Sequence, residues 1–275
     1  MPVQIGETEV QAALHEFWWF GLKQARACVF AGSFFVILFA SKHIPLGSMP
    51  RYDFIFLAAV ALQIALVAMR IETLDELKVI CVFHVIGLAL EIFKTDPRIG
   101  EWSYPEASFF RIRAVPLYSG FMYASVASYM CQAWRLLKLD LTGYPPYALS
   151  VPLSAAIYAN FFTRHFLPDV RWVLAALVII IFWKARVWFT VTEKRRFMPI
   201  ALSFFLIGLF VWLAENISTY LGAYLYPNQQ GGWQHVAFRR VSSWFLLVII
   251  SFMIVADLKH LKERLKRQAP TDRCG

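Results

Sequence analysis

The chain is dominated by long runs of apolar residues that alternate with short polar segments. A helix needs about 20 mostly apolar residues to cross a bilayer, and eight of the runs approach that length. The predicted spans are residues 21–41, 53–70, 74–93, 114–137, 147–163, 171–189, 197–221 and 237–257. The pattern therefore predicts an all-α fold, a polytopic bundle of about eight transmembrane helices.

Composition supports this assignment, because 59 % of the 275 residues are hydrophobic and only 16 % are charged. Soluble domains are about half apolar and a quarter charged, so a water-soluble enzyme is excluded. The formal net charge of +9 would suggest nucleic acid in a soluble protein. No nucleic-acid-binding motif accompanies it, so we expect membrane lipids as partners and no nucleic acid.

The distribution of basic residues predicts the orientation. Loops on the side that carries both ends of the chain hold the greater share of the 27 Lys and Arg residues. Basic loops stay in the cytoplasm, so both termini are predicted to be cytoplasmic. Residues 1–20 would form a cytoplasmic or interfacial segment, and residues 258–275 a basic cytoplasmic tail.

Short polar marks recur at a separation of 122 residues. Ser41-Lys42-His43-Ile44 falls on Thr163-Arg164-His165-Phe166, and Gly100, Trp102, Tyr104 and Pro105 fall on Gly222, Tyr224, Tyr226 and Pro227. We interpret this as an internal duplication, with residues 21–137 and 138–257 as four-span repeats. An even number of spans makes the repeats parallel, so a shared site would open to the non-cytoplasmic side.

Ionisable side chains at membrane depth are costly and often functional. His84 and Glu91 are two helical turns apart and share a face with Gly87, and Lys94 follows one turn later. This is either a polar stripe leading to the outer surface, or a buried histidine beside a local Glu91–Lys94 pair.

Further candidates come from the later spans and the outer loops. Two carboxylates near one site can divide acid and base roles, so Glu91, Glu215, His84 and Glu101 are the candidate catalytic residues. An interhelical hydrogen bond is the alternative role for Glu215. The candidate substrate-binding residues are Lys94, Trp102, Tyr104, Arg111, Arg113, Tyr226, His235 and Arg239.

The sequence lacks the motifs of several well-known enzyme classes. The sequence contains no HExxH zinc motif, no GxSxG elbow and no Walker loop. One clearly mid-span histidine, His84, disfavours a haem held between two spans. We therefore predict no metal site, and the sequence identifies no cofactor.

Three stretches carry a resemblance to a known family. HVIGLALEIFKTDPRIGEWSYPE, VPLYSGFMYASVASY and ENISTYLGAYLYPNQQGGWQHV resemble the YoaT-like family of bacterial integral membrane proteins, across nearly the whole chain. The resemblance implies a multi-span protein of the bacterial inner membrane and brings no activity.

A fainter similarity links Glu91, Gly100, Trp102, Tyr104 and Val115-Pro116 to membrane carotenoid hydratases and cyclases. It would imply membrane-embedded carboxylates that protonate a polyene. The Pro-x-Glu-Glu motif of the cyclases is missing here.

Three functions remain open at this stage. The first is an enzyme or binder for an apolar, isoprenoid or lipid-like substrate in the outer half of the bundle, with Glu91 as general acid and Glu215 or Glu101 as its partner. The second is a small-solute transporter built from two parallel repeats. The third is a structural subunit that binds another membrane protein.

Overall fold

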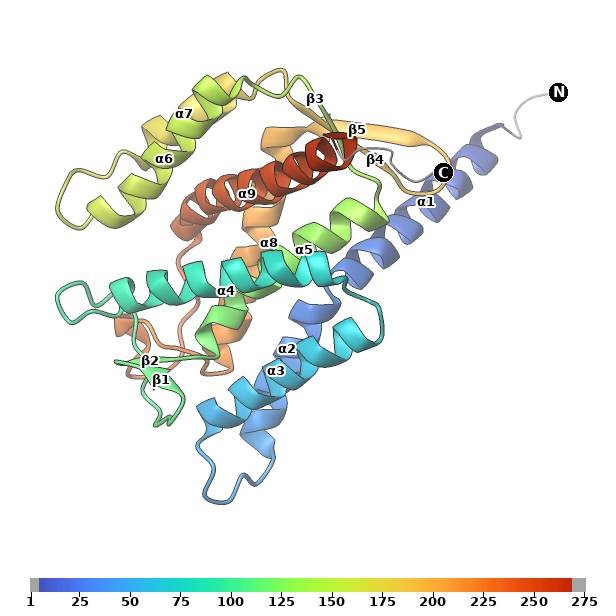
Figure 1. Cartoon of the computed structure of the whole chain (residues 1–275). Coiled ribbons are helices and arrows are strands. Elements are labelled where there is room, and N and C mark those ends of the chain that lie inside the picture. The colour runs from blue at the N-terminus through green and yellow to red at the C-terminus, as the bar shows by residue number, and fades with distance from the viewer. Residues whose placement is uncertain (1–4, 269–275) are drawn as a thin grey trace, which may run out of the picture.

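The computed structural model describes residues 5–268, which are mostly helical (Figure 1). The α-helices in this range are α1 (Ile5–Ala27), α2 (Val29–His43), α3 (Arg51–Ala68), α4 (Leu74–Lys94), α5 (Ser119–Leu136), α6 (Tyr147–Thr163), α7 (Arg171–Ile181), α8 (Ile200–Tyr220) and α9 (Val241–Gln268). Two 3₁₀ helices, η1 (Pro227–Gln229) and η2 (Phe238–Arg240), lie between α8 and α9.

The all-α prediction is wrong in detail, because two small antiparallel sheets are present at opposite ends of the molecule (Figure 1). Strands β1 (Arg111–Ile112) and β2 (Val115–Pro116) form one hairpin. The second sheet has the order β3-β4-β5, formed by Asp140–Thr142, Arg186–Thr190 and Arg195–Pro199. Strands β2, β4 and β5 overlap segments that the hydrophobic pattern predicts as spans, so the pattern did not reveal them.

The predicted spans agree unevenly with the helices. Residues 147–163 form α6, and residues 74–93 lie within α4. The predicted span 171–189 is wrong as one helix, because α7 ends at Ile181 and β4 begins at Arg186. The predicted span 114–137 begins too early, since α5 starts at Ser119 after strand β2.

Two described helices, α3 and α8, are long and apolar enough to cross a membrane. The predicted span 21–41 runs through the break at Cys28, where the segments Glu9–Ala27 and Val29–His43 bend by 61°. The bent pair passes the same test of length and hydropathy when counted as one span, which makes three candidates.

Local sequence signals set the helix starts. Thr73 accepts a hydrogen bond from the backbone N–H of Glu76, whose side chain accepts one from the backbone of Thr73, so α4 begins with a capping box. Helices α3, α6 and α8 begin directly after Pro50, Pro146 and Pro199. A proline there supplies no N–H, and its restricted φ suits the entry into a helix.

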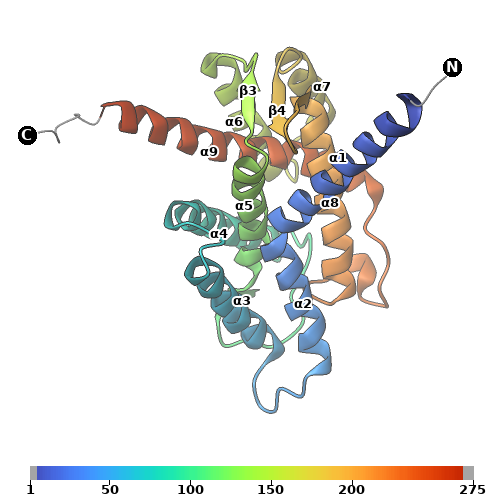
Figure 2. The same ribbon diagram turned by 90° about the vertical axis from the view of Figure 1, so that its right-hand side faces the viewer.

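The helices pack in two similar sets. The closest packing joins α4 to α5 and α8 to α9, and α2 contacts α3 as α6 contacts α7. Helix α1 contacts α5 and α2, while its N-terminal end projects away from the other helices (Figure 2); the helix crosses the predicted boundary at residue 20. Helix α9 continues into the predicted basic tail as far as Gln268, and residues 1–4 and 269–275 lie outside the described range.

Candidate functional site

Glu91 lies near the end of α4 and is only 2 % exposed. Its Oε2 accepts hydrogen bonds from the indole of Trp102 at 2.6 Å and the phenol of Tyr104 at 2.7 Å. Its Oε1 accepts a hydrogen bond from the phenol of Tyr123, on α5, at 2.8 Å. Three aromatic donors therefore satisfy this buried carboxylate.

Glu215 on α8 has the same kind of surroundings and is 4 % exposed. Its Oε1 accepts hydrogen bonds from Tyr226 and, at 3.5 Å, from Tyr224. Its Oε2 accepts a hydrogen bond from the indole of Trp244, on α9, at 2.8 Å. The two glutamates thus have matching aromatic cages, each built from one loop and one following helix.

The two cages meet along a short backbone pairing. Ser103 N–H donates to the Leu225 carbonyl at 2.9 Å, and Leu225 N–H donates to the Ser103 carbonyl at 3.0 Å. These residues are 122 positions apart, the same separation as that of the polar marks in the sequence. The ring of Trp102 lies 6.1 Å from that of Tyr224 and 6.0 Å from that of Tyr226. Aromatic side chains of the two loops, residues 95–118 and 221–240, therefore pack into one core.

Glu101 lies at the centre of a cationic cluster next to this core. Its Oε1 lies 3.3 Å from the fully buried Lys94 Nζ, 3.0 Å from His165 Nε2, and forms an ion pair with Arg164. Arg240 approaches Oε2 at 3.9 Å. Burial opposes ionisation of Glu101, but the charges of Arg164, Lys94 and Arg240 outweigh it and hold the pKa of that carboxyl below its usual value. An ionised Glu101 compensates the buried ammonium.

His84 occupies the same face of α4, where it packs on α5. Its ring contacts Phe121 edge-on at 4.6 Å between centroids, and its Nδ1 is buried without a hydrogen-bond partner in the protein. An added Cβ at Gly120 would lie 2.7 Å from that nitrogen. The predicted stripe of His84, Gly87 and Glu91 thus faces the seam between α4 and α5.

The remaining candidates divide into two groups. Lys94, Trp102, Tyr104 and Tyr226 belong to the core described above. The structure does not bring the other four candidates into it, and all are exposed: Arg111, Arg113, His235 and Arg239.

Sequence reasoning missed several members of the core. Tyr123 and Trp244 donate hydrogen bonds to the two glutamates but lie inside apolar runs. An aromatic residue in such a run is ordinarily interpreted as part of the hydrophobic core. No sequence pattern indicated that Arg164 and Arg240 converge on Glu101. Tyr224 could have been found, because it is the 122-residue counterpart of Trp102.

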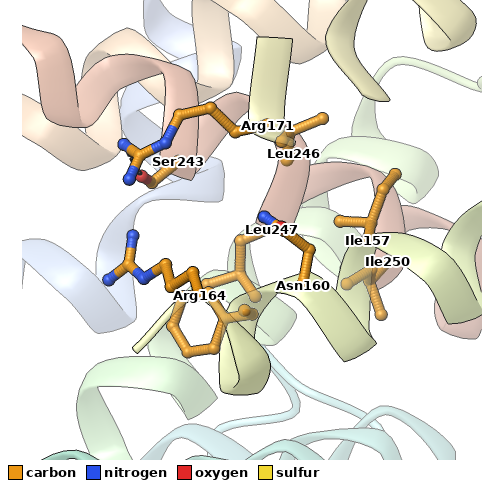
Figure 3. A pocket seen from close by; sticks show the side chains of 9 residues that line it. Ile157, Asn160, Arg164, Arg171, Ser243, Leu246, Leu247 and Ile250 are labelled. Atoms are coloured by element: carbon orange, nitrogen blue, oxygen red, sulfur yellow. Dashed lines mark hydrogen bonds between the residues drawn. The ribbon is translucent and has the colours of Figure 1, made fainter. Parts of the chain in front are cut away.

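A second polar feature lies between α6, α7 and α9 (Figure 3). This cavity of about 20 Å³ has room for little more than one water molecule. Arg164 and Arg171 extend their guanidinium groups on the same side of it, and Arg171 donates to Ser243 at 3.0 Å. Among the residues that the structure describes, no group of three or more His, Cys, Asp and Glu side chains could hold a metal ion.

Fold and site define a predominantly helical protein with two or three helices able to cross a membrane and a core of two caged carboxylates. The chain belongs to the family described as "Protein of unknown function (DUF817)", whose model matches residues 16–252. It is 54 % identical over 253 residues to the "Uncharacterized protein YoaT" of Bacillus subtilis (strain 168), an alignment covering 92 % of this chain and 95 % of that protein. No solved structure matches the chain. The family resemblance is thereby confirmed, and the similarity to carotenoid enzymes stays a prediction.

Proposed function

We propose that the protein is a multi-pass protein of the bacterial inner membrane, with both termini cytoplasmic, and that it binds or converts a lipid-like molecule. The single observation that carries the proposal is the pair of matching cages around Glu91 and Glu215. Buried carboxylates are costly at membrane depth, so two of them in equivalent places point to a shared role.

The proposed topology has two parallel halves. Strand β3 pairs with β4, so the chain leaves one face through α6 and returns to the same face through α7. The pairing of Ser103 with Leu225 brings the two long loops together at the other end. Helix α7 has 11 residues, about 16 Å of rise, so the sixth pass is the shortest in this topology.

Reciprocal contacts between the halves support a duplication. Tyr118 donates to the carbonyl of Ala223, while Arg240 approaches Glu101. Tyr118 and Arg240 are 122 residues apart, and so are Glu101 and Ala223. A pseudo-twofold axis along the membrane normal relates such pairs, as parallel repeats require.

The two cages favour a role in proton transfer for Glu91 and Glu215 over a role as permanently charged groups. Each carboxylate receives phenol groups, which can donate a hydrogen bond to the ionised form and rotate away when it is protonated. In this proposal Glu91 is the general acid, Glu215 or Glu101 is its partner, and Tyr104 and Tyr226 position the substrate.

Genetic complementation tests this proposal. Variants Glu91→Gln and Glu215→Gln keep the shape of each side chain and remove its ability to ionise. We expect both to fail to restore a deletion strain while reaching wild-type levels in the membrane. Glu106→Gln is the matched control, because Glu106 is partly exposed and forms an ion pair with Arg51. Full restoration by both cage variants would refute the proposal.

Transport is the second candidate, favoured by one observation. Glu72 is 2 % exposed at the other end of α4 and accepts hydrogen bonds from Gln63 and Ser128. A solute path needs polar groups in both halves of the membrane, and this cluster supplies one on the proposed cytoplasmic side. A transporter predicts that Glu72→Gln abolishes complementation as fully as Glu91→Gln.

A further inference from the structure

The cavity between α6, α7 and α9 carries polar and apolar side chains on opposite sides. Arg164, Arg171 and Ser243 lie together on one side, whereas Ile157 and Ile250 lie on the other (Figure 3). Ile157 precedes Arg164 by seven residues along α6, and Ile250 follows Ser243 by seven residues on α9, which is two helical turns in each case. In the proposed topology, the arginines therefore lie toward the outer surface and the apolar residues lie deeper in the membrane.

Exposed aromatic residues beside the arginines indicate the level of the lipid headgroups. Trp172 directly follows Arg171 and is 67 % exposed, and Phe166 lies two residues after Arg164 and is 71 % exposed. Tryptophan is enriched where a membrane protein crosses the interface between lipid and water. The polar side of the cavity is therefore expected at the depth of the phosphate groups of the bilayer.

Arg164 also belongs to the cationic cluster, in which positive charge is in excess. Lys94, Arg164 and Arg240 all have a side-chain nitrogen within 3.9 Å of a Glu101 oxygen, so one carboxylate contacts three cations. The side chain of Arg164 is only 11 % exposed, and charges held away from water are costly unless they are paired. An anion that binds next to Arg164 would compensate this excess.

Both guanidinium groups at the cavity keep donors for such an anion. A guanidinium has five N–H groups. In the part of the chain that the structure describes, Arg171 donates to Asp169 and Ser243, and Arg164 donates to Glu101, which leaves at least two N–H groups on each arginine. The cavity of about 20 Å³ has room for one oxygen atom of an anion, and the rest of the anion would lie at its mouth. Guanidinium groups bind phosphate particularly well, because their planar fork matches two phosphate oxygens.

We propose that the cavity between α6, α7 and α9 binds the phosphate group of an anionic phospholipid from the outer leaflet. Arg164 and Arg171 hold the phosphate, and an acyl chain packs along the apolar side formed by Ile157 and Ile250. The proposal rests on the membrane setting of the proposed function, and it does not depend on an acid–base role of the two caged glutamates.

Native mass spectrometry of the full-length protein, released from detergent micelles, tests the proposal. The protein is titrated separately with phosphatidylglycerol, with phosphatidylcholine that has the same chains, and with glycerol phosphate, which is a headgroup without chains. We expect the first phosphatidylglycerol to bind about tenfold more tightly than the first phosphatidylcholine, which has no net charge. Glycerol phosphate should not bind at the same concentration, because it lacks the apolar contact.

A substitution in the cavity locates the binding. Arg171→Gln removes one guanidinium and leaves the pair of Arg164 with Glu101 in place. It should weaken the binding of phosphatidylglycerol about tenfold, the ratio for the loss of one hydrogen bond between charged groups. Arg98→Gln is the matched control, because it removes the same charge from an exposed position in the outer loop that does not line the cavity, and it should bind like the wild type.

Three results would overturn the proposal. They are equal binding of the two phospholipids by the wild type, equal effects of Arg171→Gln and Arg98→Gln, and binding of glycerol phosphate as tight as that of phosphatidylglycerol. The last result would assign the cavity to a soluble phosphate compound.

The test is separable from that of the proposed function. Neither Glu91 nor Glu215 lines this cavity, so Glu91→Gln should keep the lipid preference of the wild type while failing to complement. A wild-type protein without that preference would reject the lipid site and leave the complementation result unaffected.

Discussion

Replacing Gly87 by alanine would push a methyl group into the ring of Tyr123. An added Cβ at this position lies 2.5 Å from Cγ and Cδ2 of Tyr123 and 2.7 Å from its Cβ, far inside van der Waals contact. The Cβ of Tyr123 is attached to the backbone of α5, so a simple rotation of the ring does not relieve the overlap. Either the ring changes rotamer or α4 and α5 separate, and both break the bond from Tyr123 to Glu91.

The expected loss of stability combines two terms. A hydrogen bond to a charged group contributes about 1.5–3 kcal/mol, and overpacking costs about 1–3 kcal/mol. We therefore expect Gly87→Ala to reduce the free energy of unfolding by about 2.5–6 kcal/mol. Gly32→Ala is the control, because nothing lies within 4 Å of its added Cβ, and it should be neutral or stabilising.

Equilibrium unfolding in mixed micelles with increasing SDS, followed by tryptophan fluorescence, measures these differences. Tyr123→Phe removes only the hydrogen bond, and the double variant Gly87→Ala/Tyr123→Phe completes a cycle. If alanine displaces the ring, the double variant is no less stable than Gly87→Ala alone. Strict additivity, or a Gly87→Ala protein as stable as Gly32→Ala, would refute the described packing.

Three further predictions concern the same core. Glu101→Gln leaves the buried ammonium of Lys94 without a nearby carboxylate and should cost about 3–5 kcal/mol by unfolding in micelles, whereas Glu106→Gln should cost about 1 kcal/mol or less. Because the pKa of Glu101 is lowered in the folded state, its stabilising effect is complete above the ordinary carboxyl pKa and is lost as pH falls through the lowered value; an unfolding series at decreasing pH should show this loss in the wild type and not in Glu101→Gln. Gly208→Ala places a Cβ 2.9 Å from the backbone nitrogen of Phe245, so it should destabilise the contact between α8 and α9 by about 2 kcal/mol or more in the same assay.

Hydrophobic patterning predicted helices well where the helix is long and only one of its faces is buried. Residues 147–163 and 74–93 are examples, because apolar runs there end at prolines, a capping threonine or a basic turn. It failed at 171–189, where Val187 and Phe189 continue the apolar run as a strand. When nearly every residue is apolar, the pattern does not distinguish the period of a helix, about 3.6 residues, from that of a strand, about 2 residues.

The site was predictable in part because its key residues are chemically conspicuous. A glutamate within an apolar run is a candidate functional residue because its burial is costly. The shift of 122 residues also aligned Trp102 and Tyr104 with Tyr224 and Tyr226. The register did not place Glu215 on Glu91, since the two differ by 124 positions, yet their carboxylates receive equivalent donors. Helix packing can accommodate a difference of two residues between the two glutamates. A comparison at one fixed shift of the sequence does not detect it.

Disulfide cross-linking in the native membrane tests the central claim, that the two halves meet as counterparts above the paired carboxylates. Residues paired by two reciprocal hydrogen bonds in an antiparallel bridge have Cα atoms about 5.5 Å apart, within the range of a disulfide. A variant carrying Ser103→Cys and Leu225→Cys, with the native cysteines replaced, should form an intramolecular cross-link on mild oxidation. The pair Ser103→Cys and Thr142→Cys should not cross-link, because Thr142 belongs to β3, which lies at the end of the molecule opposite to the hairpin of β1 and β2 (Figure 1). Absence of the first cross-link in a correctly inserted protein, or its formation only between separate chains, would contradict the account.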